Sequence, residues 1–145
     1  MAAAFLERGT AMPTDGLITL ASSHGPSETM SRLEAAVKTN GMSVFARIDH
    51  AAGAAGIGTS LRPTEVLILG NPKGGTPLMQ STQTIGIDLP LRALVWEDAS
   101  GKTWLSYNDP AWLAKRHALD HHLAAAVDAL STALDAVAKA ATARP

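Results

Sequence analysis

Residues 89–109, LPLRALVWEDASGKTWLSYND, decide the fold, because this stretch contains two strands, the turn between them and the start of a helix. Alternating apolar and polar residues lie on both sides of residues 99–101, Ala-Ser-Gly, which form a typical hairpin turn. Asp109 is followed by a proline, and this pair is a common helix start. The stretch therefore predicts a hairpin of residues 91–98 with 102–107, followed directly by a helix.

The flanking sequence supplies the remaining elements, which are recognised by their hydrophobic period and by their turn residues. Before the hairpin we expect a strand at 17–20, a helix at 26–39, strands at 42–50 and 64–71, and a short helix that begins at Pro77 with Thr76 as its cap. Residues 51–63 read as a loop. The last helix is expected to run to about Ala140, with a bend near the histidines. The order βαββαββα predicts an α+β fold, in which a single two-layer domain has a mainly antiparallel sheet with its helices on one face.

Composition narrows the function classes. The 145 residues suit one domain, and a net charge of -1 without a cluster of Lys or Arg argues against nucleic-acid partners. The chain has no cysteine, which excludes disulfides, thiolate metal sites and a cysteine nucleophile. With 46% hydrophobic and 17% charged residues, part of the surface is a candidate for coverage by a partner.

The ends of the chain bear on domain limits and location. We expect residues 1–14 to be a loose tail, residues 15–141 to form the domain and residues 142–145 to be a second tail. The opening MAAAFLERGTAMP lacks the charged start and long apolar region of a secretory signal. No segment approaches the roughly 18 apolar residues of a membrane span. A cytoplasmic protein without a membrane partner is therefore expected.

Four ordered segments resemble a known family. They are RIDHAAGA (47–54), RPTEVLILGNPKGGTPLM (62–79), DLPLRALVWED (88–98) and WLSYNDPAWLAKRH (104–117), and together they are similar to the domain-of-unknown-function family 302. The resemblance covers about residues 16–119. It implies a small bacterial α+β domain that is often a homodimer. The Ala-rich extension beyond Leu119 departs from the family pattern.

Two histidines are the leading candidates for cofactor or metal binding. His50 ends a predicted strand on its aliphatic face, next to a loop of small residues, and His117 lies at the edge of the apolar stripe of the last helix. A neutral imidazole in apolar surroundings can ligate a metal or a haem iron. The alternative is a core histidine that is hydrogen-bonded to a neighbour. A metal chelate of His117 with His121 is disfavoured because HALDH lacks the HExxH glutamate, and His122 is expected to be a surface residue.

Aromatic and basic residues form a second candidate site. Arg47, Arg92, Trp96 and Tyr107 are expected to project from one side of the sheet. Such a patch is typical of a dimer interface, and it also suits the wall of a pocket for an anionic planar ligand. For GNPKGGT (70–76), a plain turn capped by Thr76 is favoured over a phosphate loop, because the lysine does not directly precede the hydroxyl residue.

These features lead to three hypotheses. The first is a non-enzymatic, homodimeric protein that binds a small molecule or cofactor, with haem as the favoured ligand of His50 and His117 and with Arg92, Trp96 and Tyr107 lining its site. The second is an enzyme that uses His50 with Asp49 or Arg92 on a small acidic substrate. The third is a structural module that assembles through its C-terminal helix.

Overall fold

The computed structural model describes residues 14–145, and in this part of the chain five strands form one antiparallel sheet. The strands are β1 (Leu17–Ala21), β2 (Ser43–Asp49), β3 (Thr64–Gly70), β4 (Leu91–Glu97) and β5 (Thr103–Asn108). Their order across the sheet is β1-β5-β4-β3-β2, so the predicted hairpin of β4 and β5 lies at the centre. The α+β fold class is confirmed. The expected tail at residues 1–14 lies almost entirely outside the described residues.

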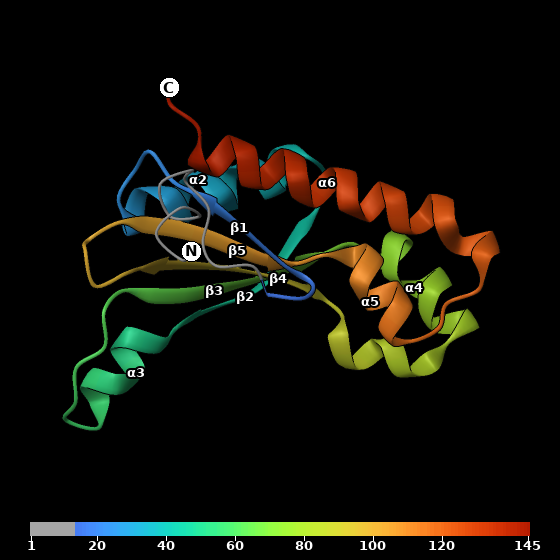
Figure 1. Cartoon of the computed structure of the whole chain (residues 1–145), viewed down its shortest axis with the longest axis horizontal. Coiled ribbons are helices and arrows are strands. Elements are labelled where there is room, and N and C mark those ends of the chain that lie inside the picture. Colours follow the sequence, from blue (N-terminus) through green and yellow to red (C-terminus); the bar gives the residue numbers. More distant parts are fainter. Residues whose placement is uncertain (1–13) are drawn as a thin grey trace.

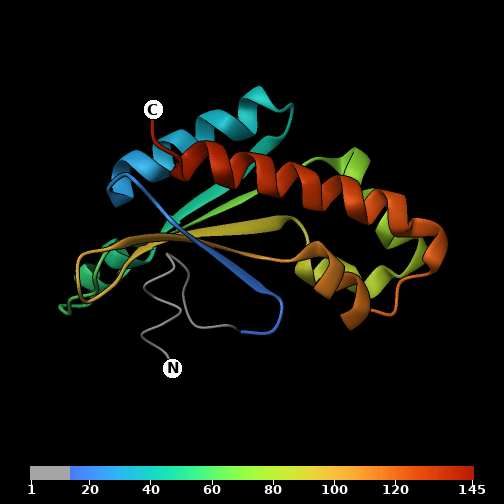
Figure 2. The ribbon, with the colours of Figure 1, turned by 45° about the horizontal axis from the view of Figure 1, so that its top comes forward.

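The two long helices cover one face of the sheet. They are α2 (Pro26–Thr39) and α6 (Ala124–Thr142), which lie side by side above the strands (Figures 1 and 2). The shorter helices lie at the two ends of the molecule. Four of them, α4 (Pro72–Ser81), η1 (Gln83–Asp88), α5 (Pro110–Arg116) and η2 (His121–Leu123), gather at one end, and α3 (His50–Gly56) projects from the other (Figure 1). The expectation of helices on one face holds for α2 and α6.

The core lies between this helix pair and the sheet. Alternate strand residues point into it, as the period of two requires, and they meet the apolar stripes of α2 and α6. Its fully buried members include Met30, Leu33, Leu67, Leu69, Leu105 and Leu134. The small residues Ala138 and Ala141 of α6 are also buried in this core, and α6 packs against α2.

The structure confirms one long helix of the prediction and divides the other. Helix α2 begins and ends where expected, with Gly25 and Asn40 as its caps. The predicted C-terminal helix is two helices, because α5 stops at His117 and Ala118 adopts a left-handed φ of 50°. Asp120 then starts the new turn η2 by accepting a hydrogen bond from the His122 backbone. A bend was expected here, and the structure has a break.

Residues 51–63 are not entirely a loop, and α4 begins earlier than predicted. Asp49 accepts a hydrogen bond from the Ala52 backbone at 2.9 Å, and this cap lets the alanines that follow form α3. Likewise Asn71, with Lys73 N at 2.9 Å, caps α4, so Thr76 is not the cap and Pro77 lies inside the helix. Asn71 and Thr76 are each followed by a proline, and the helix begins after the first of them, Asn71.

Strand β2 does not present one aliphatic face. Its register shifts between Val44 and Ala46, which is the signature of a β-bulge. As a result Val44 packs against the core, whereas Ala46 and Ile48 lie on the opposite side of the sheet. The strand ends at Asp49, so His50 is the first residue of α3 and does not continue the alternation.

Candidate functional site

His50 and His117 do not share a site within one chain. His50 is exposed at the first position of α3, and His117 is the C-cap of α5. Figure 1 shows these two helices at opposite ends of the long axis. No group of three or more His, Asp or Glu side chains suited to a metal occurs within residues 14–145. The predicted pairing of these histidines as metal or haem ligands is therefore wrong for a single chain, because His50 follows β2 and α5 follows β5, and these two strands run in opposite directions.

His117 instead forms a closed polar cluster. Its Nε2 lies 2.6 Å from Asp88 Oδ2, and its Nδ1 lies 3.2 Å from Thr84 Oγ1. Arg116 Nη1 donates to both oxygens of Asp88 at 3.0 Å. The imidazole is 8% exposed. Because both ring nitrogens have partners, His117 joins α5 to η1 and has no free lone pair for a metal.

The remaining histidine hypotheses also change. His121 lies in η2, beyond the break, so the i,i+4 geometry of a chelate with His117 is lost. His122 is a surface residue as expected, and its Nδ1 lies 2.6 Å from Asp120 Oδ1. Hydrogen bonds from His122, first from its backbone and then from its ring, lower the pKa of Asp120. These residues stabilise the turn between α5 and α6.

The aromatic and basic patch divides between the two faces of the sheet. Arg92 and Trp96 project from the face that α2 and α6 leave uncovered, and they line the same shallow hollow there. Tyr107 also borders this hollow, but its side chain belongs to the core, where the residue is only 4% exposed. Arg47 also lies on the helix side, beside α2. Arg92 and Trp96 therefore share one face as predicted, whereas the prediction is wrong for the side chains of Arg47 and Tyr107, which lie on the helix side of the sheet.

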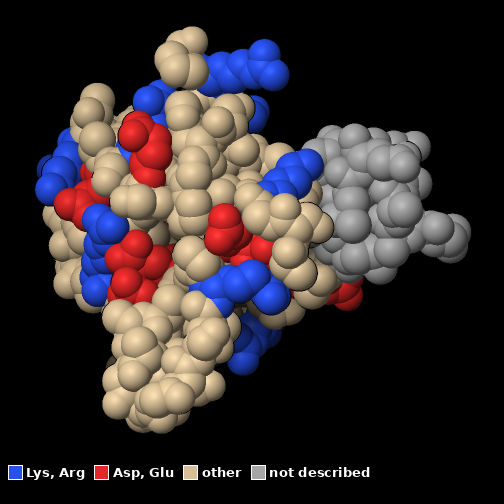
Figure 3. Space-filling model, turned by 90° about the vertical axis from the view of Figure 1, so that its left-hand side faces the viewer, with Lys and Arg blue, Asp and Glu red and all other residues tan. Residues whose placement is uncertain are grey.

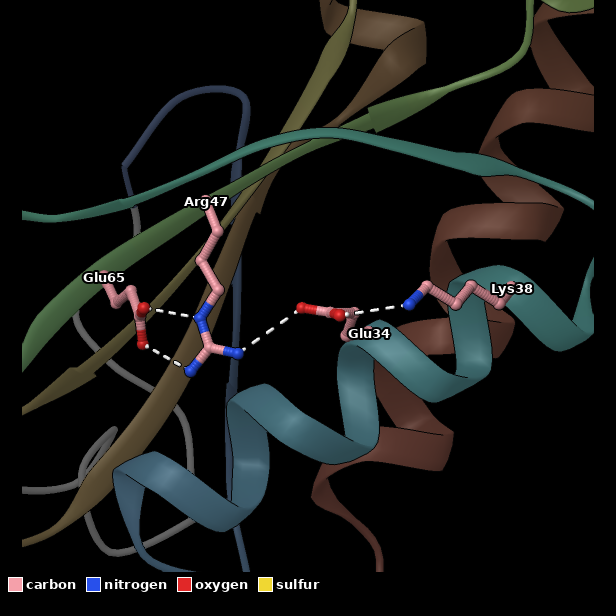
Figure 4. Close-up of polar contacts among 4 residues, drawn as sticks. All are labelled: Glu34, Lys38, Arg47 and Glu65. Atoms are coloured by element: carbon pink, nitrogen blue, oxygen red, sulfur yellow. Dashed lines mark hydrogen bonds and ion pairs between the residues drawn. The ribbon is translucent and has the colours of Figure 1, made fainter.

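Arg47 belongs to an ion-pair network at the edge of the sheet (Figure 4). Its guanidinium donates to both oxygens of Glu65 on β3, and its Nη1 lies 3.4 Å from Glu34 on α2. The Glu65 hydrogen bonds raise the pKa of Arg47, and the Lys38 side chain is the main cause of the lowered pKa of Glu34. The network links α2 to β2 and β3, so the guanidinium of Arg47 is paired with carboxylates of its own chain.

The side of the sheet opposite α2 and α6 is largely apolar, and its polar side chains are partly paired with one another. We call it the open face and define it by Thr19, Ile48, Ile68, Arg92, Leu94, Trp96, Trp104 and Ser106. Thr19 Oγ1 lies 2.8 Å from Ser106 Oγ, which also accepts from Trp96 Nε1 at 2.9 Å. Burial of these hydroxyls against another surface would leave their hydrogen bonds intact. Trp104 and Ser106 are already buried, whereas Arg92 is exposed and Leu94 and Trp96 are half-buried, so the part of the open face around β4 is suited to contact with a partner.

A small apolar pocket lies where β3 leads into α4. We call it the β3–α4 pocket; its volume is about 200 Å³ and its wall includes Phe45, Asn71, Thr76, Met79, Leu89 and Leu130. Gly70 and Gly75 also line it, and the absence of their side chains leaves the space vacant. The sequence patterns did not predict this pocket. The glycines of GNPKGGT were its only local signal, because Phe45 and Leu130 come from distant parts of the chain.

The projecting α3 and the residues after it form an uncharged lobe. Residues 50–61 contain no Asp, Glu, Lys or Arg, and Figure 3 shows them as an uninterrupted tan protrusion at the bottom of the view. Ile57 is 83% exposed there. His50 at its start forms no hydrogen bond with Asp49 or Arg92, and Asp49 is occupied as the cap of α3. These residues do not assemble the acid–base pair that the enzyme hypothesis needs.

Comparisons with known proteins place the chain among proteins of undefined role. The model of DUF302, a domain of unknown function, matches residues 18–137. A crystal structure of an uncharacterized conserved DUF302 protein from Bacillus stearothermophilus superposes with a TM-score of 0.79 over 88% of this chain and 99% of that one. Their sequences are 22% identical, so this likeness speaks for the fold alone.

Curated relatives carry a specific name. The fluoride-specific ion channel FluC 1 of Brucella suis biovar 1 is 53% identical over 124 residues, which are 86% of this chain and 49% of that protein. FluC 2 of Brucella melitensis biotype 1 shows the same identity over 46% of its length. The chain thus spans about half the length of the curated relatives it matches. Within residues 14–145, no helix is long and apolar enough to cross a membrane.

Proposed function

This chain belongs to the DUF302 family of domains of unknown function, and on that premise we propose that it is a non-enzymatic, cytoplasmic, homodimeric module that binds a small ligand. The observation that carries the proposal is the β3–α4 pocket, which is apolar and formed by four separate parts of the chain. Pockets of this kind, with few polar groups, are the usual sites of small-molecule binding. The pocket contains no histidine, and α3 and α5, where His50 and His117 lie, are at opposite ends of the molecule (Figure 1), so these histidines could not ligate a haem in this pocket.

The open face supports the homodimer. Five strands about 4.8 Å apart, with about six residues each at a rise of about 3.3 Å, cover a flat area of roughly 475 Å². A standard interface buries about 800 Å² of accessible surface on each partner, so most of the face would take part in the contact. Among the residues that define the open face, Arg92 alone is charged. The hydroxyls of Thr19 and Ser106 on this face are already hydrogen-bonded. A second copy of the same face is therefore a suitable cover.

Leu94→Lys is expected to convert the dimer to a monomer. The new ammonium would lie beside Arg92 on the open face, and burial of two like charges against a second copy is unfavourable. Light scattering coupled to size exclusion should give twice the 15.0 kDa chain mass for the wild type and a single chain mass for the variant. Ile87→Lys, at a residue 70% exposed outside this face, is the control and should stay dimeric. A monomeric wild type would refute the dimer.

The comparisons favour a second candidate function, which is service as an accessory domain of a fluoride channel. Its support is the 53% identity to proteins named fluoride channels, over a stretch that covers only about half of each. Channels require spanning segments, and this chain has no suitable helix among its described residues. On this proposal the chain acts beside a channel and does not itself conduct ions.

Fluoride tolerance tests the second candidate. In a fluoride-sensitive bacterial strain without its own channel, the whole Brucella suis relative is expected to confer more tolerance than its portion outside the matched stretch. Supplying this chain as a separate protein should restore part of the difference, with a shift of at least twofold in the inhibitory fluoride concentration. If deletion of the matched half leaves tolerance unchanged, the accessory role is contradicted. Expression of the two channel forms at equal levels is the necessary control.

A further inference from the structure

We infer that the β3–α4 pocket takes a compact, uncharged, mainly apolar molecule, about the size of a single substituted aromatic ring, with one hydrogen-bonding group. This inference rests on the proposed ligand-binding function and names the chemical class of its ligand. Three features of the pocket carry it, namely its size, the absence of charge in its wall and one unpaired hydroxyl.

The size sets an upper limit on the ligand. Pockets for drug-sized molecules usually measure about 300–1,000 Å³, whereas an apolar cavity of about 150 Å³ holds benzene. The β3–α4 pocket, at about 200 Å³, lies between these values and nearer the smaller one. A Cβ added to Gly75 would lie 3.5 Å from Leu89 Cδ1 and 3.8 Å from Met79 Cε, which are ordinary van der Waals distances. The pocket is therefore narrow beside Gly75.

The wall excludes charged ligands. None of its lining residues is Asp, Glu, Lys, Arg or His. Moving an ionised group from water into such surroundings without a partner is strongly unfavourable. Carboxylates, phosphates and the propionates of haem therefore do not suit this pocket, and neither do the acidic substrates of the enzyme hypothesis.

Two polar side chains stand in the wall of the pocket, and they differ in their partners. The amide of Asn71 is held in place, because its Oδ1 accepts from Lys73 N at 2.9 Å and its Nδ2 donates to Gly41 O at 3.4 Å. The Thr76 hydroxyl, in contrast, forms no hydrogen bond with another residue in the range 14–145. A hydroxyl can both donate and accept. One polar substituent on an apolar ring would satisfy it.

The wall of the pocket has exposed and half-buried members. Phe45, at the β-bulge, is 52% exposed, and Thr76 is also exposed. Met79 and Leu130 are half-buried, and the unbranched side chain of Met79 can adapt to ligands of different shapes. Because Phe45 and Thr76 are exposed, both can be changed with little effect on folding.

Benzyl alcohol and benzoate form a matched pair of probes that differ mainly in charge. We expect benzyl alcohol to bind at least tenfold more tightly than benzoate at pH 7, and the NMR signal of the Met79 methyl group to shift on titration. Thr76→Phe, which places a ring over the pocket, and Phe45→Ala, which removes an exposed part of its wall, should each weaken benzyl alcohol binding at least tenfold. Ile87→Ala, at an exposed residue outside the pocket, is the control and should bind as the wild type does.

The outcomes separate this inference from the function on which it rests. Equal binding of benzoate, or unchanged binding in both pocket variants, would overturn the inference. If hemin binds with a shifted Soret band that His50→Ala abolishes, and benzyl alcohol does not bind, the module binds a ligand but the inferred class and site are wrong. If benzyl alcohol, benzoate and hemin all fail to bind, both the inference and the ligand-binding function fail.

Discussion

Removal of residues 120–145 is expected to unfold the domain. Helix α6 is part of the core, because Leu134 and Val137 are 1% exposed and pack with residues of α2 and the sheet. Each such buried side chain contributes about 1.5–3 kcal/mol, and α6 supplies several of them. Their joint loss is comparable with the whole free energy of unfolding of a small domain, about 5–15 kcal/mol. The truncated chain should therefore lack a cooperative thermal transition by circular dichroism.

The same result bears on assembly through the C-terminal helix. The apolar stripe of α6 is buried by α2 and the sheet of the same chain, so it is not a free surface for a partner. Leu134→Ala is the milder companion variant, and it should lower the free energy of unfolding by about 2–5 kcal/mol while keeping a cooperative transition. A truncated protein that melts cooperatively near the wild-type temperature would show that α6 is dispensable, which the packing contradicts.

The sequence correctly predicted the elements that are marked by turn or cap residues close to them in the chain, where no second start or stop signal lies nearby. The hairpin of β4 and β5 has a turn between two alternating runs, and α2 has a cap, a first-turn proline and a stopping Asn-Gly pair. Where two local signals compete, the prediction failed. Asn71 and Thr76 both precede prolines, and the residues between them are compatible with either helix start, so only the packing of α4 shows which one caps.

The candidate site was harder to predict, because it depends on which face each residue takes and on contacts between distant segments. One extra residue at the bulge in β2 changes the side of every residue after it. That shift separated Arg47 from the residues with which it was grouped. The β3–α4 pocket joins Phe45 and Leu130 across the fold, and no pattern within a short window can reveal such a contact.

Trp104→Ala is expected to lower the free energy of unfolding by about 3–5 kcal/mol, the usual cost for a buried tryptophan. Trp104 is 1% exposed although it lies on the open face. Its ring stacks on Trp96 with centroids 6.0 Å apart, and Lys102 Nζ lies 4.6 Å from the ring centroid. Urea unfolding followed by circular dichroism measures the loss. Trp112→Ala, at a residue 37% exposed, is the matched control and should cost about 1–2 kcal/mol.

Trp104→Phe separates the ring from its N–H. In the wild type Trp104 Nε1 donates to Asp98 Oδ2 at 2.9 Å, and this hydrogen bond is the main cause of the lowered pKa of Asp98. Phenylalanine keeps most of the packing but cannot donate, so the pKa of Asp98 should rise toward its ordinary value in a carboxyl NMR titration. A lowered native pKa contributes stability above the unfolded-state pKa of about 3.9, and this contribution is lost as the pH falls through the native value. The variant should therefore lose less stability than the wild type on acidification below about pH 4. An unchanged pKa of Asp98 would mean that the backbone donors Ser100 and Lys102 hold the carboxylate without help from Trp104.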